Sequence, residues 1–256
     1  MAKERSSNYP PVVLCLASAL LLSAGWLMTS FPIFIFLGLA PLFALTDRAD
    51  NTAGIWEKME WVLIALTVHF LAARAFDFSF TASSILYAIL FTLPFIGQIW
   101  MKQVLGSKAG KITIILFWLA IEYTILKIDP GHGVYLADAV QQKAAWTHWN
   151  MNTGYLGASL WILVVNLLVY QTLFSKTSLK WHWIILTVIA LAGPIVYSYS
   201  QSSYLSRETM LNLYDLGDNT GNVTYLARGE FVVRTAAWIS TLIILFTFVK
   251  AQTTKR

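Results

Sequence analysis

The fold class is decided by Thr81–Leu105, which reads TASSILYAILFTLPFIGQIWMKQVL. This stretch is longer than the roughly 20 apolar residues that a helix needs to cross the hydrocarbon core of a bilayer. Its one charged residue is Lys102, close to its end. Pro94 lies inside it and predicts a kink. A membrane helix tolerates such a kink because neighbouring helices can satisfy the carbonyl groups that the kink frees. The stretch therefore indicates a transmembrane helix.

Similar apolar segments lie on both sides of this stretch. They are Pro10–Met28, Phe31–Thr46, Glu60–Phe76, Lys111–Lys127, Leu156–Phe174, Trp181–Ser198 and Phe231–Lys250. With residues 81–105 they predict an all-α integral membrane protein, a bundle of about eight transmembrane helices in a single domain over residues 1–256. Phe31–Thr46 is short and contains Pro32 and Pro41, so we expect it to be a tilted or incomplete span.

The composition excludes a water-soluble protein. Hydrophobic residues make up 57% of the chain and charged residues 12%, whereas an average soluble domain is about 25% charged. So few charges could not cover so much apolar surface in water. The net charge of +5 reflects basic residues in short connectors, which is typical of membrane loops and does not indicate nucleic-acid binding.

The basic residues also predict the orientation. Lys3 and Arg5 precede the first apolar segment, a layout that also fits a signal sequence. Since that segment is long enough to span, we interpret it as an uncleaved first helix. Of the 18 Lys and Arg residues, 12 then lie on the side of the N-terminus and 6 on the other side. This asymmetry predicts that both termini are cytoplasmic.

Two long connectors lie on the outer side. The first, Ile128–Tyr155, opens with a turn cluster and contains Tyr135, Trp146 and Trp149. Because Trp and Tyr prefer the level of the lipid headgroups, it predicts a short interfacial helix. The second, Tyr199–Glu230, is too short for a catalytic domain.

Two polar residues lie inside predicted spans. Glu122 must face the bundle interior or a wet cavity, because a carboxylate at membrane depth is costly. A structural bond to a neighbouring helix is favoured over a headgroup or proton site, although the sequence names no partner. For Asn166, a hydrogen bond between helices is favoured over contact with a ligand.

Two further polar groups lie near span ends. His69, Arg74 and Asp77 end the third span, where Arg74 could pair with Asp77 or extend to the interface. Asp129, His132, Asp138 and His148 share the first outer connector, but their spacing matches no compact metal motif.

Catalytic signatures are absent from the sequence. There is no Gly-x-Ser-x-Gly elbow, P-loop or dinucleotide fingerprint. The single cysteine, Cys15, lies in an apolar span with no charged neighbour that would favour its thiolate. We therefore expect no cofactor and no metal.

Four stretches resemble the membrane domain of the bacterial apolipoprotein N-acyltransferase family. They are LLLSAGW (Leu20–Trp26) with Phe31-Pro32 and Ala40-Pro41-Leu42; FWLAIEY (Phe117–Tyr123); Trp149 and Thr153-Gly154 with GASLW (Gly157–Trp161), ending in Asn166; and NVTYLARGE (Asn222–Glu230). The resemblance extends over nearly the whole chain, and its strength lies in the order of these short motifs.

This chain lacks one domain that the proteins of that family have. Its members carry a nitrilase-like domain between the seventh and eighth helices, where this chain has only residues 199–230. The Glu, Lys and Cys that catalyse acyl transfer in the family belong to that domain, and no position here corresponds to them. The resemblance therefore implies a non-catalytic relative that binds phospholipid or lipoprotein in the bacterial inner membrane, as an accessory or scaffold.

The implied contacts with lipid, lipoprotein or a partner membrane protein are Glu122, Tyr123, His148, Trp149, Asn166 and Arg228. The alternative is an acyltransferase in lipoprotein maturation, with catalytic groups supplied by a partner chain or by intramembrane groups such as Glu122 and His148. Transport ranks last, because no internal repeat is visible.

Overall fold

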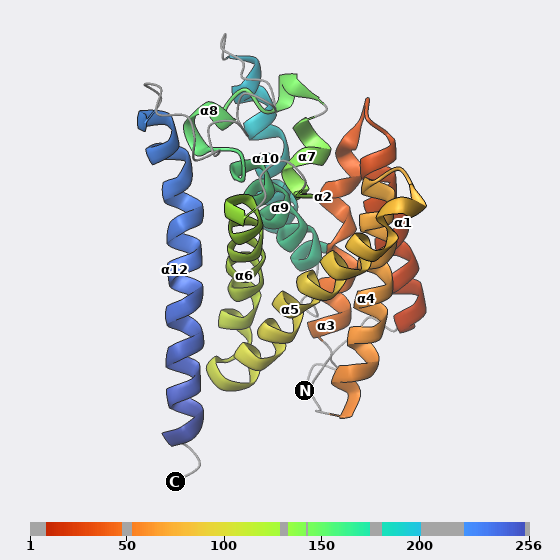
Figure 1. Ribbon diagram of the computed structural model, residues 1–256, viewed down its shortest axis with the longest axis vertical. Coiled ribbons are helices and arrows are strands. Elements are labelled where there is room, and N and C mark those ends of the chain that lie inside the picture. The colour runs from red at the N-terminus through yellow and green to blue at the C-terminus, as the bar shows by residue number, and fades with distance from the viewer. Residues whose placement is uncertain are drawn as a thin grey trace. The chain divides into compact units, whose positions relative to one another are not determined.

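The computed structural model in Figure 1 describes residues 9–47, 53–128, 133–141, 143–174, 181–200 and 223–253. Within these ranges every regular element is a helix and there is no strand. The predicted all-α class is therefore confirmed. Four helices are long and apolar enough to cross a membrane, which supports a membrane protein: Phe78–Leu105, Ala109–Ile128, Trp181–Tyr199 and Val232–Lys250.

The longer helices follow the apolar segments of the sequence. They are α1 (Pro11–Leu27), α3 (Ala40–Asp47), α4 (Ala53–Ala73), α5 (Thr81–Leu105), α6 (Ser107–Ile128), α9 (Gly157–Leu173), α10 (Trp181–Tyr199) and α12 (Val223–Thr253). Short helices lie between them: η1 (Pro32–Phe34), α2 (Ile35–Gly38), η2 (Phe78–Phe80), α7 (Leu136–Gln141), η3 (Ala144–Trp146) and α8 (Asn150–Thr153).

The chain divides into two compact units. The first comprises residues 1–92 and 161–196, and the second comprises residues 93–160 and 197–256. The division passes through α5, beside the helical Pro94, and through α9.

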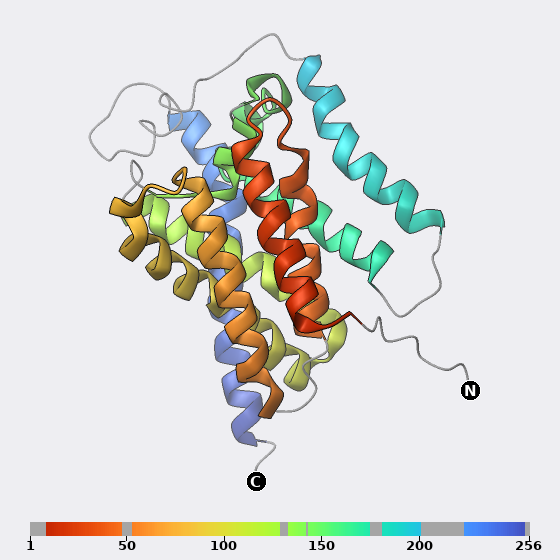
Figure 2. The same ribbon diagram turned by 90° about the vertical axis from the view of Figure 1, so that its right-hand side faces the viewer.

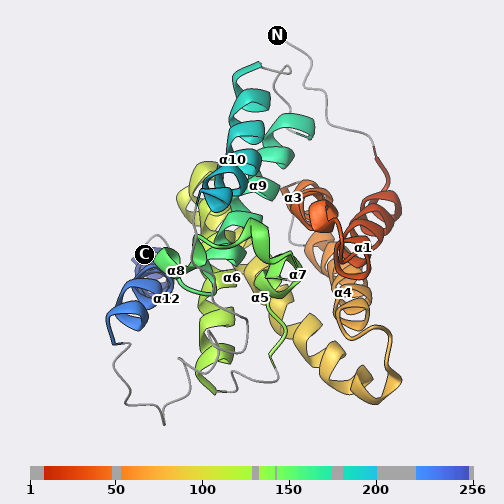
Figure 3. The ribbon, with the colours of Figure 1, turned by 90° about the horizontal axis from the view of Figure 1, so that it is seen from above.

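In the first unit, α1 packs along α2, α3 and α4. Figures 2 and 3 show α1 and α4 side by side. Gly25 permits the approach of α1 to α2, because a Cβ atom there would lie 2.7 Å from the backbone nitrogen of Ile35. Ser18, two turns earlier on α1, donates a hydrogen bond to the carbonyl oxygen of Gly38. Small residues bring helices together in membranes in this way.

In the second unit, α6 and α12 run alongside each other (Figure 1), and α8 also packs on α12. Lys250 anchors the far end of α12, where its Nζ donates to the carbonyl oxygen of Val104 at 3.0 Å. The ring of Trp118 meets Phe95 edge-on, with centroids 6.2 Å apart, and joins α6 to α5.

The helix in the region of the third predicted span has different bounds from the predicted segment. It was expected at residues 60–76, but α4 extends from Ala53 to Ala73. The helix ends there because Ala75 and Phe76 adopt positive φ angles of 51° and 57°. The side chain of Asp77 then accepts the backbone N–H of Ser79 at 2.9 Å and begins the next helical segment.

Candidate functional site

Glu122 lies on α6 and is completely buried. Its Oε1 accepts two hydrogen bonds, one from Trp118 Nε1 at 3.1 Å and one from the backbone N–H of Leu136 at 2.8 Å. Oε2 has no hydrogen-bond partner among the described residues. The partner that the sequence could not name is therefore the first turn of α7.

Three successive backbone N–H groups at the start of α7 are satisfied by side chains. Leu136 donates to Glu122, Ala137 donates to Ser159 Oγ at 3.0 Å, and Tyr135 donates to Asp138 Oδ2 at 3.0 Å. The first N–H groups of a helix have no partner within the helix, so they must be paired when they are buried. Carboxylates are also favoured there by the helix dipole. The arrangement holds α7 against α6 and α9.

Asp138 connects this arrangement to the rest of the connector. Its Oδ1 accepts a hydrogen bond from the hydroxyl of Tyr155, and the rings of Tyr135 and Tyr155 meet at 90° with centroids 5.7 Å apart. Both tyrosines are fully buried. Asp138 therefore links the start of α7 to the chain that leads into α9.

The first outer connector is packed inside the protein. A short helix does form, as α7, but all six of its residues are buried. Trp146 and Trp149 are buried as well, and the indole N–H of Trp149 donates to the carbonyl oxygen of Trp146 at 2.9 Å. Their position at the level of the lipid headgroups stays a prediction, but their side chains are buried within the protein.

The other predicted contacts in this unit have the following surroundings. His148 is half-buried, and its backbone N–H donates to Ser198 Oγ at 2.8 Å. Tyr123 is half-buried beside Lys127, whose Nζ lies 5.7 Å from the ring centroid. Arg228 belongs to α12, but its side chain lies outside the described part of the structure.

In the first unit, the side-chain amide of Asn166 forms hydrogen bonds through both its oxygen and its nitrogen. Oδ1 accepts the N–H groups of Leu39 and Ala40 at 2.7 and 3.2 Å. Nδ2 donates to the carbonyl oxygens of Ile35 and Ile162, both at 2.9 Å. These four bonds fill the amide's capacity of two donors and two acceptor positions. They bridge the break between α2 and α3.

His69, Arg74 and Asp77 do not form a shared site. His69 is buried, with its ring centroid 6.1 Å from that of Trp26. The guanidinium of Arg74 lies 4.5 Å from the ring centroid of Phe80. Asp77 is exposed, and hydrogen bonds from Ser79 lower the pKa of its carboxyl.

No group of three or more metal-ligating residues occurs within the described ranges. Asp129 and His132 lie outside those ranges. Cys15 is a free, buried thiol on α1.

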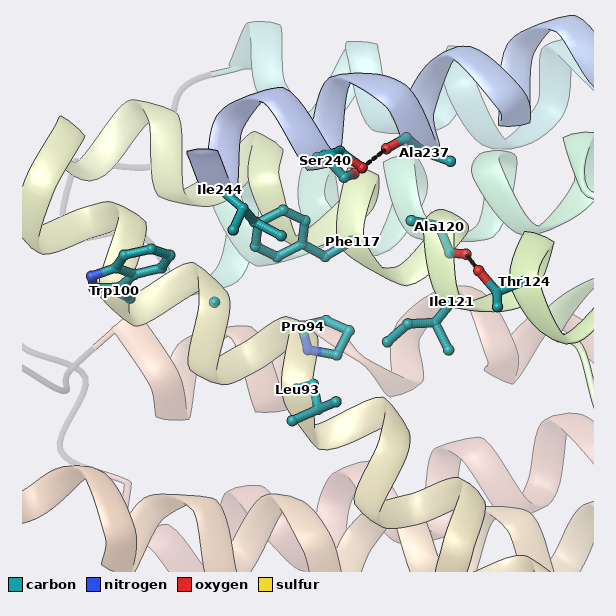
Figure 4. Close-up of a pocket in the computed structure, with 12 residues that line it drawn as sticks. Leu93, Pro94, Trp100, Phe117, Ala120, Ile121, Thr124, Ala237, Ser240 and Ile244 are labelled. Atoms are coloured by element: carbon teal, nitrogen blue, oxygen red, sulfur yellow. Dashed lines mark hydrogen bonds between the residues drawn. The ribbon is translucent and has the colours of Figure 1, made fainter. Parts of the chain in front are cut away.

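A cavity of about 390 Å³ lies between α5, α6 and α12 in the second unit, as Figure 4 shows. Most of its lining is apolar: Leu93, Pro94, Gly97, Trp100, Phe117, Ala120, Ile121, Thr124, Ala237, Ser240, Thr241 and Ile244. Its volume falls in the range of small-molecule pockets, about 300–1,000 Å³.

The hydroxyl groups in this lining are already paired within their own helices. Thr124 donates to the carbonyl oxygen of Ala120 at 2.8 Å, as drawn in Figure 4. Thr241 donates to the carbonyl oxygen of Ala237 at 3.1 Å. Ser240 donates to Ala236 at 2.7 Å. The wall of the cavity therefore presents few unpaired polar groups, which suits an apolar ligand.

A close contact between α5 and α6 lies in the lining of this cavity. Gly97 on α5 faces the ring of Phe117 on α6, and a Cβ atom at Gly97 would lie 2.4 Å from that ring. The cavity was not predicted from the sequence. Its one usable signal was the set of small residues within long apolar helices, and such residues also occur at ordinary helix contacts.

No family model, no curated protein and no solved structure matches this chain.

Proposed function

We propose that this chain is a multi-pass protein of the bacterial cytoplasmic membrane that binds a membrane lipid in the cavity between α5, α6 and α12. The observation that carries the proposal is the apolar lining of that cavity, formed by three helices that each contain a candidate membrane span. An acyl chain is the apolar ligand that a bilayer supplies to such a site in excess.

The proposed topology has eight spans and two cytoplasmic termini. Four helices meet the length and hydropathy of a span, and Pro11–Leu27, Pro32–Asp47 and Gly157–Leu173 are shorter apolar helices. The eighth is α4, a helix of 21 residues that carries Glu57, Lys58 and Glu60 near its start. The distribution of Lys and Arg supports the orientation.

The proposed role is that of a non-catalytic relative of apolipoprotein N-acyltransferase, an accessory or scaffold for lipid or lipoprotein. The four resembling stretches support the relationship. The geometry of the polar groups supports the lack of catalysis, because Glu122 and Ser159 bind the backbone of α7 and Cys15 is 3% exposed. Acyl transfer through a covalent intermediate requires a nucleophile that substrate can reach and a base beside it.

Native mass spectrometry of the purified protein tests lipid binding. Wild type should retain phospholipid, and Ala237→Phe, which places a large ring in the cavity, should lose it. Ala192→Phe is the matched control, because Ala192 is exposed on α10. Equal retention of lipid by both variants would contradict the proposed cavity.

A second assay tests the lack of catalysis. The purified chain is incubated with phospholipid and a diacylated lipoprotein peptide, and the peptide is then weighed by mass spectrometry. We expect no added acyl chain. A gain of one acyl chain would show that the protein is an enzyme.

A further inference from the structure

A second cavity, of about 440 Å³, adjoins the apolar one. Its lining is Tyr123, Thr124, Arg234, Ala237, Trp238 and Thr241. Three of these residues, Thr124, Ala237 and Thr241, also line the apolar cavity. The two cavities are therefore parts of one groove along α6 and α12, which we call the α6–α12 groove.

The groove has a direction. On α12 its polar part begins at Arg234, near the start of the apolar stretch Val232–Lys250, and its apolar part reaches Ile244. Ten residues of α-helix correspond to about 15 Å. That length is half of the roughly 30 Å hydrocarbon core. The groove thus has the length of one leaflet, with its polar end at a membrane surface.

The polar end combines a cation with aromatic side chains. Arg234 is exposed and lines the second cavity. Trp238 is 63% exposed one turn further along α12, and Tyr123 faces the same cavity from α6. Lys127, at the end of α6, lies over the ring of Tyr123.

These side chains match the headgroup region of a lipid. Trp and Tyr prefer the boundary between acyl chains and water. A guanidinium binds phosphate through charge-assisted, bidentate hydrogen bonds. No acidic residue is among the described residues that line either cavity.

We propose that the α6–α12 groove selects a phospholipid with a net negative headgroup, which Arg234 holds while an acyl chain lies along Ile121 and Ile244. This inference rests on the proposed function, because it names the lipid that the cavity binds. Phosphate alone does not explain the apolar half of the groove. A zwitterionic lipid carries an ammonium group, which two nearby cations would repel.

Competition between two lipids tests the selectivity. The purified chain is mixed with equal amounts of phosphatidylglycerol and phosphatidylcholine that carry the same acyl chains, and native mass spectrometry measures the ratio bound. A basic residue at a membrane surface contributes a preference for anionic lipid of about five-fold. We expect wild type and Arg234→Lys to show that preference and Arg234→Gln to bind the two lipids nearly equally.

Lys250→Gln is the matched control for loss of positive charge, because Lys250 is an exposed cation at the opposite end of the same helix. It should keep the preference. Equal preferences for anionic lipid in Arg234→Gln and Lys250→Gln would overturn the inference about the headgroup. They would not contradict lipid binding in the apolar cavity. Retention of both lipids by Ala237→Phe would instead overturn the proposed function.

Competition with inorganic phosphate distinguishes a site for a lipid headgroup from a site for a free anion. Millimolar phosphate should not displace phosphatidylglycerol from wild type, because the acyl chain contributes to binding. Displacement by phosphate, or phosphate binding that survives Ala237→Phe, would show a site for a free anion and overturn the inference.

Discussion

The carboxylate of Glu122 accepts the backbone N–H of Leu136 at 2.8 Å, across 14 residues of sequence. With Asp138 and Ser159 it pairs three consecutive N–H groups at the start of α7. This relationship explains how a polar connector can be buried. Each donor that folding removes from water has an acceptor, and unpaired buried donors are costly.

Glu122→Leu should strongly destabilise the protein, because it leaves the N–H groups of Leu136 and Trp118 buried without an acceptor. We expect a loss of about 2–5 kcal/mol. Glu122→Gln keeps an acceptor oxygen and should lose less. Unfolding by SDS in mixed micelles, followed by circular dichroism, measures the difference. Glu60→Leu is the control at an exposed carboxylate on α4, and equal stability of Glu122→Leu and Glu60→Leu would contradict this role.

Asn166→Leu should also destabilise, since it removes four hydrogen bonds and unpairs the N–H groups of Leu39 and Ala40. Hydrogen bonds between transmembrane helices average about 0.6 kcal/mol, but buried orphan groups add to that cost. We expect a loss of about 1–3 kcal/mol. Gln171→Leu, on the same helix, removes an amide for which the described residues show no hydrogen bond. The same unfolding assay should find it nearly neutral, and a cost equal to that of Asn166→Leu would rule out the bridging role.

Gly25→Ala should separate α1 from α2, because the new Cβ atom would meet the backbone of Ile35 at 2.7 Å. Overpacking of this kind costs about 1–3 kcal/mol. Gly193→Ala is the matched control, since nothing lies within 4 Å of a Cβ atom there. Thermal unfolding in detergent should show a lower midpoint for Gly25→Ala only, and equal midpoints would argue against close packing at Gly25.

The proposed orientation predicts which sites a membrane-impermeant maleimide can reach. In a Cys15→Ala background, Ser79→Cys precedes α5 on the outer side and Gln103→Cys lies near its cytoplasmic end. Both positions are exposed. Labelling of intact cells should modify Ser79→Cys, and Gln103→Cys only after permeabilisation. The reverse pattern would invert the topology, and labelling of both sites in intact cells would mean that α5 does not span.

The sequence predicted the helices well, because long apolar segments require backbone groups to be paired within each segment. α10 extends over Trp181–Tyr199 and differs from its predicted segment by one residue. The end of α4 was predicted less well. It depends on positive φ angles at Ala75 and Phe76, residues that give no turn signal of their own.

The partners of the polar residues could not be predicted. Leu136 is a backbone donor 14 residues from Glu122, so no helical periodicity relates the two. The break that Asn166 bridges lies more than 120 residues earlier in the chain. Tyr135 and Trp149 have the residue types of an interfacial belt, and only tertiary packing determines that they are buried.

Photo-crosslinking with a phospholipid that carries a diazirine on its acyl chain tests lipid binding in the α6–α12 groove most directly. Peptide mapping should find the label on groove residues such as Ile121, Thr241 and Ile244, and Ala237→Phe should reduce it. Helix α10 is the internal reference for bulk lipid, since Ser198 is its only buried residue. Stronger labelling of the groove residues than of α10 would support lipid binding in the groove. Equal labelling of the groove and of α10, unchanged in Ala237→Phe, would contradict it.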